Sequence, residues 1–272
     1  MQTFNQITSS VFDWILAPFG HGPVWFDLLL WPVLAGVVAL LIYKAVSNQA
    51  GIADAKRRIT VHLLEVVLYR ENVLGVLKST MLGLGQNLRY LAYNVVPMLI
   101  LIVPMTIILV QLVANYAYAP LEPGAVRLLE VTLAPDSPVG VREVSARFPP
   151  QVGVQAGAGR APGPRVFWRL QMLEAGDPPL GPAAGGEVQA KAVAVGGDAR
   201  KVPVLRSRSW DALLYPGEDA LPPGSAFETI RVSVPTRSLG FIPSGEGGIL
   251  AWFFLASLAA GFLLRKRLGV TL

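Results

Sequence analysis

The feature that most constrains this chain is a long run without charge: no Asp, Glu, Lys or Arg occurs between Tyr90 and Leu121. About 20 apolar residues are enough to cross the hydrocarbon core of a bilayer. Two other segments are also strongly apolar, and the last of them is closed by the basic cluster Arg265–Arg267. The sequence therefore predicts three transmembrane helices, over residues 24–44, 91–118 and 248–264.

Composition supports a membrane protein and excludes several kinds of chemistry. Only 15% of the residues are charged, against about a quarter in soluble domains. Without cysteine there is no disulfide, thiol catalysis, Cys-ligated zinc or iron–sulfur cluster. The two histidines, His21 and His62, lie in different segments, so a two-histidine metal site is not expected. The net charge of +5 does not come from a basic patch with interleaved aromatics, which argues against nucleic acid as a partner.

The positions of Lys and Arg predict the orientation in the membrane, because short cytoplasmic loops carry an excess of these residues. Basic residues are frequent in 45–90 and in the tail 265–272, whereas none precedes Lys44. We therefore expect both regions to be cytoplasmic, in a membrane of the bacterial inner (plasma) type. The N-terminal segment 1–23 and the long region 119–247 are then expected outside.

Two polar-flanked segments are predicted to be helical outside the spans. In the first 23 residues, an apolar face at helical spacing predicts a short interfacial helix; it comprises Phe4, Ile7, Val11, Trp14 and Ile15. Residues 45–90 predict a helical hairpin with a break at Glu71–Asn72, where Asn72 is able to cap the second helix. Pairing of the two helices is expected to bury two apolar stripes; they comprise Ile59, Leu63, Val66 and Val67, and Leu74, Leu77, Met81, Leu84 and Leu88.

Region 119–247 changes character, with frequent Pro and Gly and an alternation of apolar and polar residues. Such alternation is typical of strands with one buried face. About six short strands are expected around residues 129–133, 144–148, 166–172, 188–194, 202–205 and 230–234. They predict an extracytoplasmic all-β, sandwich-like domain, with turns at Gly157–Gly159, Gly163 and Gly185–Gly186. The fold class is thus an α-helical membrane protein with three spans, a cytoplasmic hairpin and an outer β domain.

No group of residues has the arrangement of a catalytic site, and an enzyme is not expected. Ser207 and Ser209 lack a histidine partner, and Asp211, Glu218 and Asp219 lie in a polar loop. Polar residues near or within spans usually contact protein, and small residues permit close helix approach. Candidate contacts to partners or clients are therefore Arg70, Arg89, Asn94, Gln111, Asn115, Ala256, Ser257, Ala260 and Gly261.

The order of segments resembles the Oxa1/YidC/Get1/EMC3 membrane insertase superfamily over about residues 24–118 and the last span. In that superfamily a first span leads into a cytoplasmic coiled-coil hairpin and the next span begins at a proline, here Pro97. The resemblance implies a groove that lowers the barrier for a translocating segment. Two features depart from it: the nearest basic residue, Arg89, lies only at the mouth of the groove, and a β domain replaces a helical hairpin between the last spans.

Two functions follow from these features. One is a non-enzymatic accessory, scaffold or assembly subunit of a larger membrane complex, of respiratory or photosynthetic type for example. Its partners would be other integral membrane proteins, an extracytoplasmic subunit and the lipid bilayer. The alternative is an insertase or chaperone that receives clients on the hairpin. No cofactor is predicted, although apolar spans accept lipid, quinone or pigment without a motif.

Overall fold

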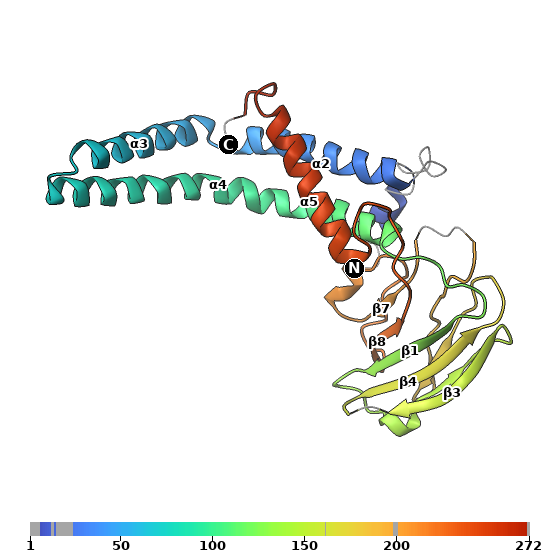
Figure 1. Ribbon diagram of the computed structural model, residues 1–272. Helices are drawn as coiled ribbons and strands as arrows, with labels where there is room; N and C mark the ends of the chain where they lie inside the picture. The colour runs from blue at the N-terminus through green and yellow to red at the C-terminus, as the bar shows by residue number, and fades with distance from the viewer. Residues whose placement is uncertain (1–5, 12–13, 15–23, 161, 198–200, 271–272) are drawn as a thin grey trace. The chain divides into compact units, whose positions relative to one another are not determined.

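The computed structural model describes residues 6–11, 14, 24–160, 162–197 and 201–270 (Figure 1). The chain forms two compact units, which we describe separately. The helical unit comprises Leu28–Ile108 and Phe253–Leu272, and the β unit comprises Met1–Asp27 and Leu109–Trp252. The boundary between the two units falls inside three helices.

Among the described residues, three helices are long and apolar enough to cross a membrane: α2 (Val24–Val46), α4 (Val73–Tyr116) and α5 (Gly245–Leu264). They confirm the three predicted spans, and the protein is an integral membrane protein. The second helix of the predicted hairpin and the second predicted span lie in one element. Helix α4 runs through both without a break, with Pro97 and Pro104 inside it. Membrane helices tolerate proline because neighbouring groups satisfy the freed backbone.

Two asparagines define the ends of the hairpin. Helix α3 (Gln49–Leu68) begins at Asn48, whose Oδ1 accepts from the backbone N–H of Gly51 at 2.9 Å. Helix α4 begins after Asn72, whose Oδ1 accepts from the N–H of Gly75 at 3.0 Å, as the sequence predicted. Such caps satisfy donors that the first turn of a helix leaves unpaired. In Figure 1, α3 lies beside the first half of α4, which confirms the hairpin.

The part of the β unit that the structure describes contains two antiparallel sheets, which confirms the predicted all-β domain. The larger has the order β3-β4-β1-β8-β7 and the smaller the order β2-β5-β6. The strands are β1 (Val126–Leu133), β2 (Ser145–Arg147), β3 (Val152–Arg160), β4 (Arg165–Met172), β5 (Gly181–Ala184), β6 (Glu187–Val188), β7 (Leu205–Ser207) and β8 (Phe227–Val232).

Alternate residues of the central strands form one core. Leu129 and Val131 of β1, Trp168 of β4 and Ile230 of β8 are buried in it. Residues from the smaller sheet and its flanks, such as Ala184 and Val144, pack in the same cluster. The two sheets therefore enclose a shared apolar layer, as in a sandwich.

Two details of the β unit differ from the prediction, and one agrees with it. Gly157–Gly159, expected as a turn, lies in the edge strand β3, whose residues are mostly exposed and lack alternation. Gly163, Gly185 and Gly186 do lie between strands with positive φ. The strand expected over 188–194 is largely irregular, because Lys191 turns inward and its Nζ donates to the carbonyls of Ala192 and Pro203 and contacts the Glu218 carboxylate.

The N-terminal segment is helical at residues 6–11 and at residue 14. Three members of the predicted apolar face, Ile7, Val11 and Trp14, are exposed. The other two, Phe4 and Ile15, lie outside the described residues. The position of this helix at the membrane interface remains a prediction.

Candidate functional site

The hairpin of the helical unit is held together by small and polar side chains. Ser79 of α4 is 7% exposed, and its hydroxyl donates to the Glu65 carboxylate of α3 at 3.0 Å. The same carboxylate oxygen lies 2.9 Å from Nδ1 of His62. At Gly83 an added Cβ would meet the Cβ of His62 at 3.3 Å. The two helices approach closely because no large side chain separates them; we call this contact the seam.

Glu65 is the acidic residue of the seam, and its contacts there lower the pKa of its carboxyl group. Hydrogen bonds from His62 and then from Ser79 hold the pKa of Glu65 below its ordinary value. The carboxylate is therefore charged at neutral pH and accepts from both helices. These hydrogen bonds, rather than buried apolar surface, hold α3 against α4 at this position.

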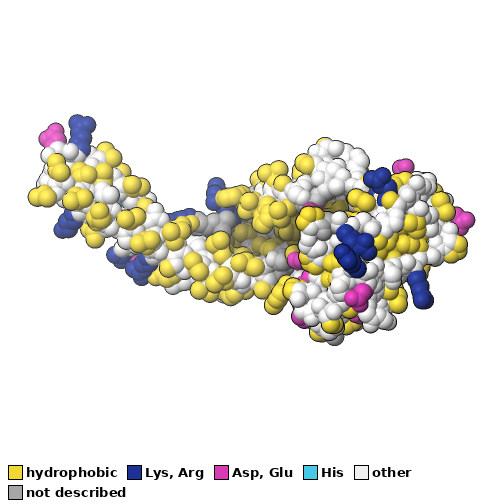
Figure 2. Space-filling view, turned by 90° about the horizontal axis from the view of Figure 1, so that it is seen from below, with side chains coloured by type: hydrophobic (Ala, Val, Ile, Leu, Met, Phe, Trp, Pro, Cys, Tyr) yellow, Lys and Arg dark blue, Asp and Glu magenta, His cyan; other side chains and the backbone are white. Residues whose placement is uncertain are grey.

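The leucines predicted to fill the seam are exposed instead. The predicted burial of the two stripes is wrong: Leu63 and Val67 of α3 and Leu77 and Leu84 of α4 all lie on the surface. Of the predicted residues, only Ile59 and Val66 are partly covered. The physical reason is the narrow spacing at Ser79 and Gly83, which leaves no room for a leucine layer. In Figure 2 hydrophobic side chains are spread along the arm that the hairpin forms at the left.

One set of exposed apolar residues surrounds the turn of the hairpin, and we call it the tip surface. Val73, for example, is 78% exposed. The charged residues of the turn itself are Arg70 and Glu71, and both are exposed. The tip surface comprises Leu63, Leu64, Val67, Leu68, Tyr69 and Val73.

A second set runs along α4, and we call it the α4 stripe. Its members are spaced alternately by three and four residues, and every one of them is exposed: Leu74, Leu77, Met81, Leu84, Leu88, Leu91, Val95, Met98 and Ile102. Met81 is two residues beyond Ser79, which corresponds to a rotation of about 200° around the helix. The stripe therefore lies on the side of α4 that faces away from α3.

Within the helical unit, the spans contact one another through polar and small residues. The Tyr43 hydroxyl of α2 donates to Oδ1 of Asn94 in α4, and Nδ2 of Asn94 donates to the Tyr90 carbonyl at 2.7 Å. A Cβ at Gly36 of α2 would lie 2.5 Å from the carbonyl oxygen of Ser257 in α5. Helix α2 thus approaches α5 at a glycine, the arrangement typical of small-residue contacts in membranes.

The structure places the predicted site residues in several environments. Arg70 is exposed in the hairpin turn, and Nε of Arg89 donates to the Tyr93 hydroxyl at 2.9 Å. Of the small residues in α5, Ser257 and Ala260 contact Gly36, whereas Ala256 is partly exposed and nothing lies within 4 Å of a Cβ added at Gly261. The set therefore does not form one site.

Gln111 and Asn115 belong to the β unit and are both buried. Nδ2 of Asn115 donates to the Gln111 carbonyl at 2.8 Å, one turn back in the same helix. Nearby in sequence, the Tyr116 hydroxyl donates to Oδ2 of Asp27 at 2.7 Å, and both residues are fully buried. These contacts stabilise helix ends within the β unit.

The β unit also holds a cluster that sequence reasoning missed. The hydroxyls of Tyr118 and Tyr215 both donate to Oε1 of Glu246, the latter at 2.9 Å. Burial, together with this carboxylate, raises the pKa of both tyrosines. They remain protonated donors at neutral pH, so the cluster ties three chain segments together and offers no base or nucleophile.

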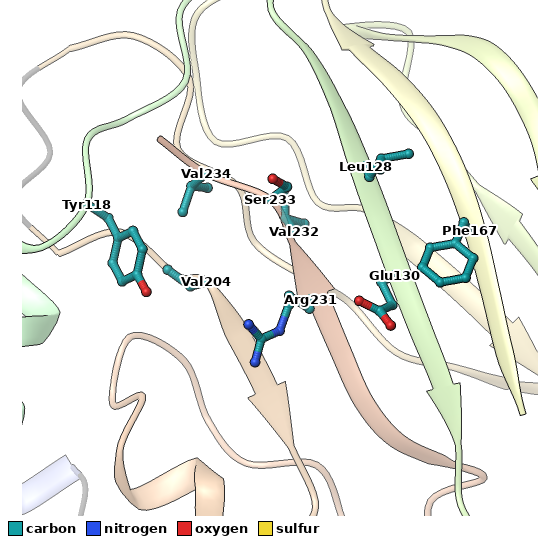
Figure 3. A pocket seen from close by; sticks show the side chains of 9 residues that line it. All are labelled: Tyr118, Leu128, Glu130, Phe167, Val204, Arg231, Val232, Ser233 and Val234. Carbon is teal, nitrogen blue, oxygen red and sulfur yellow. The ribbon is translucent and has the colours of Figure 1, made fainter. Parts of the chain in front are cut away.

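A depression of about 340 Å³ lies on the outer face of the larger sheet. Figure 3 shows the side chains that line it. Glu130 of β1 is paired with Phe167 of β4 and with Arg231 of β8 across the sheet. Tyr118 and Ser233 also line the depression. Because an acidic side chain and a basic side chain both line the depression, it favours neither anionic nor cationic ligands.

Among the described residues no group of three or more His, Cys, Asp or Glu is placed to hold a metal ion. The chain matches no protein-family model, no curated protein and no solved structure. The arrangement that stands out is the hairpin, whose apolar residues are displayed rather than buried. A sequence signal for it exists: Gly75, Ser79 and Gly83 lie opposite the leucines of α4.

Proposed function

We propose that this chain is a non-enzymatic assembly factor for membrane proteins, which contacts apolar segments of other membrane proteins with its tip surface. One observation carries the proposal: the hairpin pairs through small and polar residues and displays its large apolar residues. Exposed apolar patches on proteins mark sites of interaction. If the contact with the partner is permanent rather than transient, the same surface makes the chain an accessory or scaffold subunit of a larger complex.

The length of α4 supports placing the tip surface beyond the membrane. Its 44 residues extend about 66 Å, whereas the hydrocarbon core is about 30 Å thick. The end with Val73 lies far from the charge-free run that starts at Tyr90. Contact with lipid chains therefore does not explain the exposed apolar residues of the tip surface, whereas contact with an apolar protein segment explains them.

The proposed orientation puts the hairpin and the C-terminal tail in the cytoplasm and the β unit outside. It rests on the basic residues of 45–90 and of Arg265–Arg267. In a plasma membrane of bacterial type, the tip surface then meets newly made membrane proteins on the side of synthesis.

The second candidate function is an insertase of the Oxa1/YidC type. The continuity of the hairpin with a proline-containing span in α4 favours it. The side chain of Arg89, however, turns to Tyr93 at the end of the span, and residues 90–121 hold no charge. If this chain inserts clients, it does so without a basic residue within α4's span.

The test is site-specific photo-crosslinking in native membranes. A photo-reactive residue at Leu64 or Leu68 of the tip surface is expected to capture newly made membrane proteins during a pulse label. The matched control is Arg57, which is also exposed on α3 but lies among charged residues.

The chase separates the alternatives. Capture that fades with time indicates an assembly factor or insertase, and capture of a constant, stoichiometric partner indicates an accessory subunit. Depletion that leaves client spans uninserted would single out the insertase. Equal capture at Arg57 and Leu68, or none at Leu64 and Leu68, would overturn the proposal.

A further inference from the structure

The spacing of the α4 stripe is that of one side of a coiled coil. Its members occupy the a and d positions of four successive heptads and the first position of a fifth: Leu74, Met81, Leu88, Val95 and Ile102 at a, and Leu77, Leu84, Leu91 and Met98 at d. A strict repeat of seven residues keeps one face of a helix against a second, supercoiled helix. The occupant that fits this stripe is therefore another helix.

The stripe extends through two environments, which narrows the choice of helix. Leu74 to Leu88 precede the charge-free run, whereas Leu91 to Ile102 lie within it. An ordinary transmembrane helix loses its apolar character near the headgroups. The occupant must stay apolar at a period of 3.5 residues for two more heptads outside the bilayer.

We propose that the occupant is α4 of a second copy of this chain, packed in parallel around a twofold axis along the membrane normal. A second copy has the same stripe at the same depth and in the same orientation. Each layer then pairs with itself, for example Leu84 with Leu84. The pairing does not rest on the proposed function, because it uses the α4 stripe and not the tip surface.

The residues beside the stripe are compatible with this pairing. In a parallel coiled coil the e and g positions of the two helices face each other. Here they are almost all uncharged, with Lys78 as the single exception: Lys78, Gly85, Ala92 and Leu99 at e, and Val73, Thr80, Asn87, Asn94 and Leu101 at g. Asn94 and Leu101 already pack against α2, so within the span the open flank of the stripe is the e side. No row of like charges opposes association. Helix α3 does not obstruct it either, since the seam lies on the other side of α4.

The chain contains no cysteine, so single cysteines report the contact directly. Leu84→Cys and Leu88→Cys are placed on the stripe, and Leu82→Cys is the matched control, an exposed leucine of α4 outside the stripe. In native membranes under mild oxidation, the stripe variants are expected to form a species of twice 29.2 kDa. The control should form about tenfold less, because a disulfide needs Cβ atoms about 4 Å apart.

Two crosslinking results would overturn the pairing. One is equal crosslinking at residues 82 and 84, which indicates random collision. The other is a crosslinked species with a different partner mass, which indicates another protein on the stripe. A second measurement is the oligomeric state of the purified protein. The double variant Leu77→Asn, Leu84→Asn on the stripe should shift it from dimer to monomer with its helical circular dichroism unchanged, whereas Leu64→Ser, Leu68→Ser on the tip surface should leave the dimer intact. A stripe variant that remains a dimer contradicts the proposal.

Discussion

The β unit and the hairpin use apolar residues in opposite ways. In the β unit, alternate residues such as Leu129 and Phe227 are fully buried in one core. In the hairpin, the regularly spaced leucines are outside, and Ser79, Gly83 and Glu65 form the contact. The β unit is stabilised by burial of apolar area, whereas the seam depends on close approach and hydrogen bonds.

This difference shows what a hydrophobic period does and does not determine. A period identifies the residues that share a face of a helix or strand. It does not identify what covers that face. In the β unit the cover is the second sheet of the same chain, whereas on α4 no described residue of α3 covers the stripe.

The largest expected effect is a difference in stability between two leucine-to-alanine variants, one at a buried leucine of the β unit and one at an exposed leucine of the tip surface. Leu129→Ala should lower the free energy of unfolding of the β unit by roughly 2–5 kcal/mol, through lost burial and a cavity. Leu64→Ala should change stability by less than about 0.5 kcal/mol, as at most surface positions. Denaturant unfolding of the full chain in detergent, followed by tryptophan fluorescence, measures both. A comparable loss in Leu64→Ala would show that the tip surface is structural.

A smaller effect is expected from two glycines of α4 that differ only in their neighbours. Gly83→Leu should push α3 away from α4 and destabilise the seam by about 1–3 kcal/mol, since an added Cβ already crowds His62. Gly85→Leu meets no atom within 4 Å of its Cβ and should stabilise the helix by up to about 1 kcal/mol. Spin labels at Val61 and Leu82, both exposed, report the separation of the helices. An unchanged distance in Gly83→Leu would refute the close seam.

The smallest effect is a dependence of the seam on pH. The pKa of Glu65 is lowered in the folded hairpin from an ordinary value of 4.5. Its contribution to stability is therefore present above pH 4.5 and is lost as pH falls through the lowered pKa. The same spin labels should show the hairpin loosening under acid conditions. Glu65→Gln should be weaker at neutral pH and lack this transition; an identical acid response would assign it to another group.

Much of the fold followed from sequence because its signals are local. The three spans depend on apolar length, and the cap at Asn72 depends on one side chain and the N–H of Gly75. The core strands around Leu129 and Trp168 alternate clearly. Strand β3 was missed because an exposed edge strand of Gly and Ala carries no alternation.

The candidate surfaces were harder to predict because they depend on tertiary contacts. The irregular segment near Lys191 follows from a buried ion pair with Glu218, two residues far apart in sequence. The exposed leucines of α4 follow from the small residues on its other side. The ion pair depends on which residues meet, and a strand pattern does not contain that information. For α4 the spacing of Gly75, Ser79 and Gly83 was the available signal, but it does not by itself say that α3 packs against it.

The two prolines of α4 have a consequence for its mechanics. Each lacks the N–H that would bond to the carbonyl four residues earlier, at Tyr93 and at Ile100. Seven residues separate Pro97 from Pro104, so their rings lie about 20° apart around the helix axis. Bends at the two positions therefore add in nearly one plane instead of cancelling. Helix α4 is expected to be compliant in that plane and stiff in the perpendicular one.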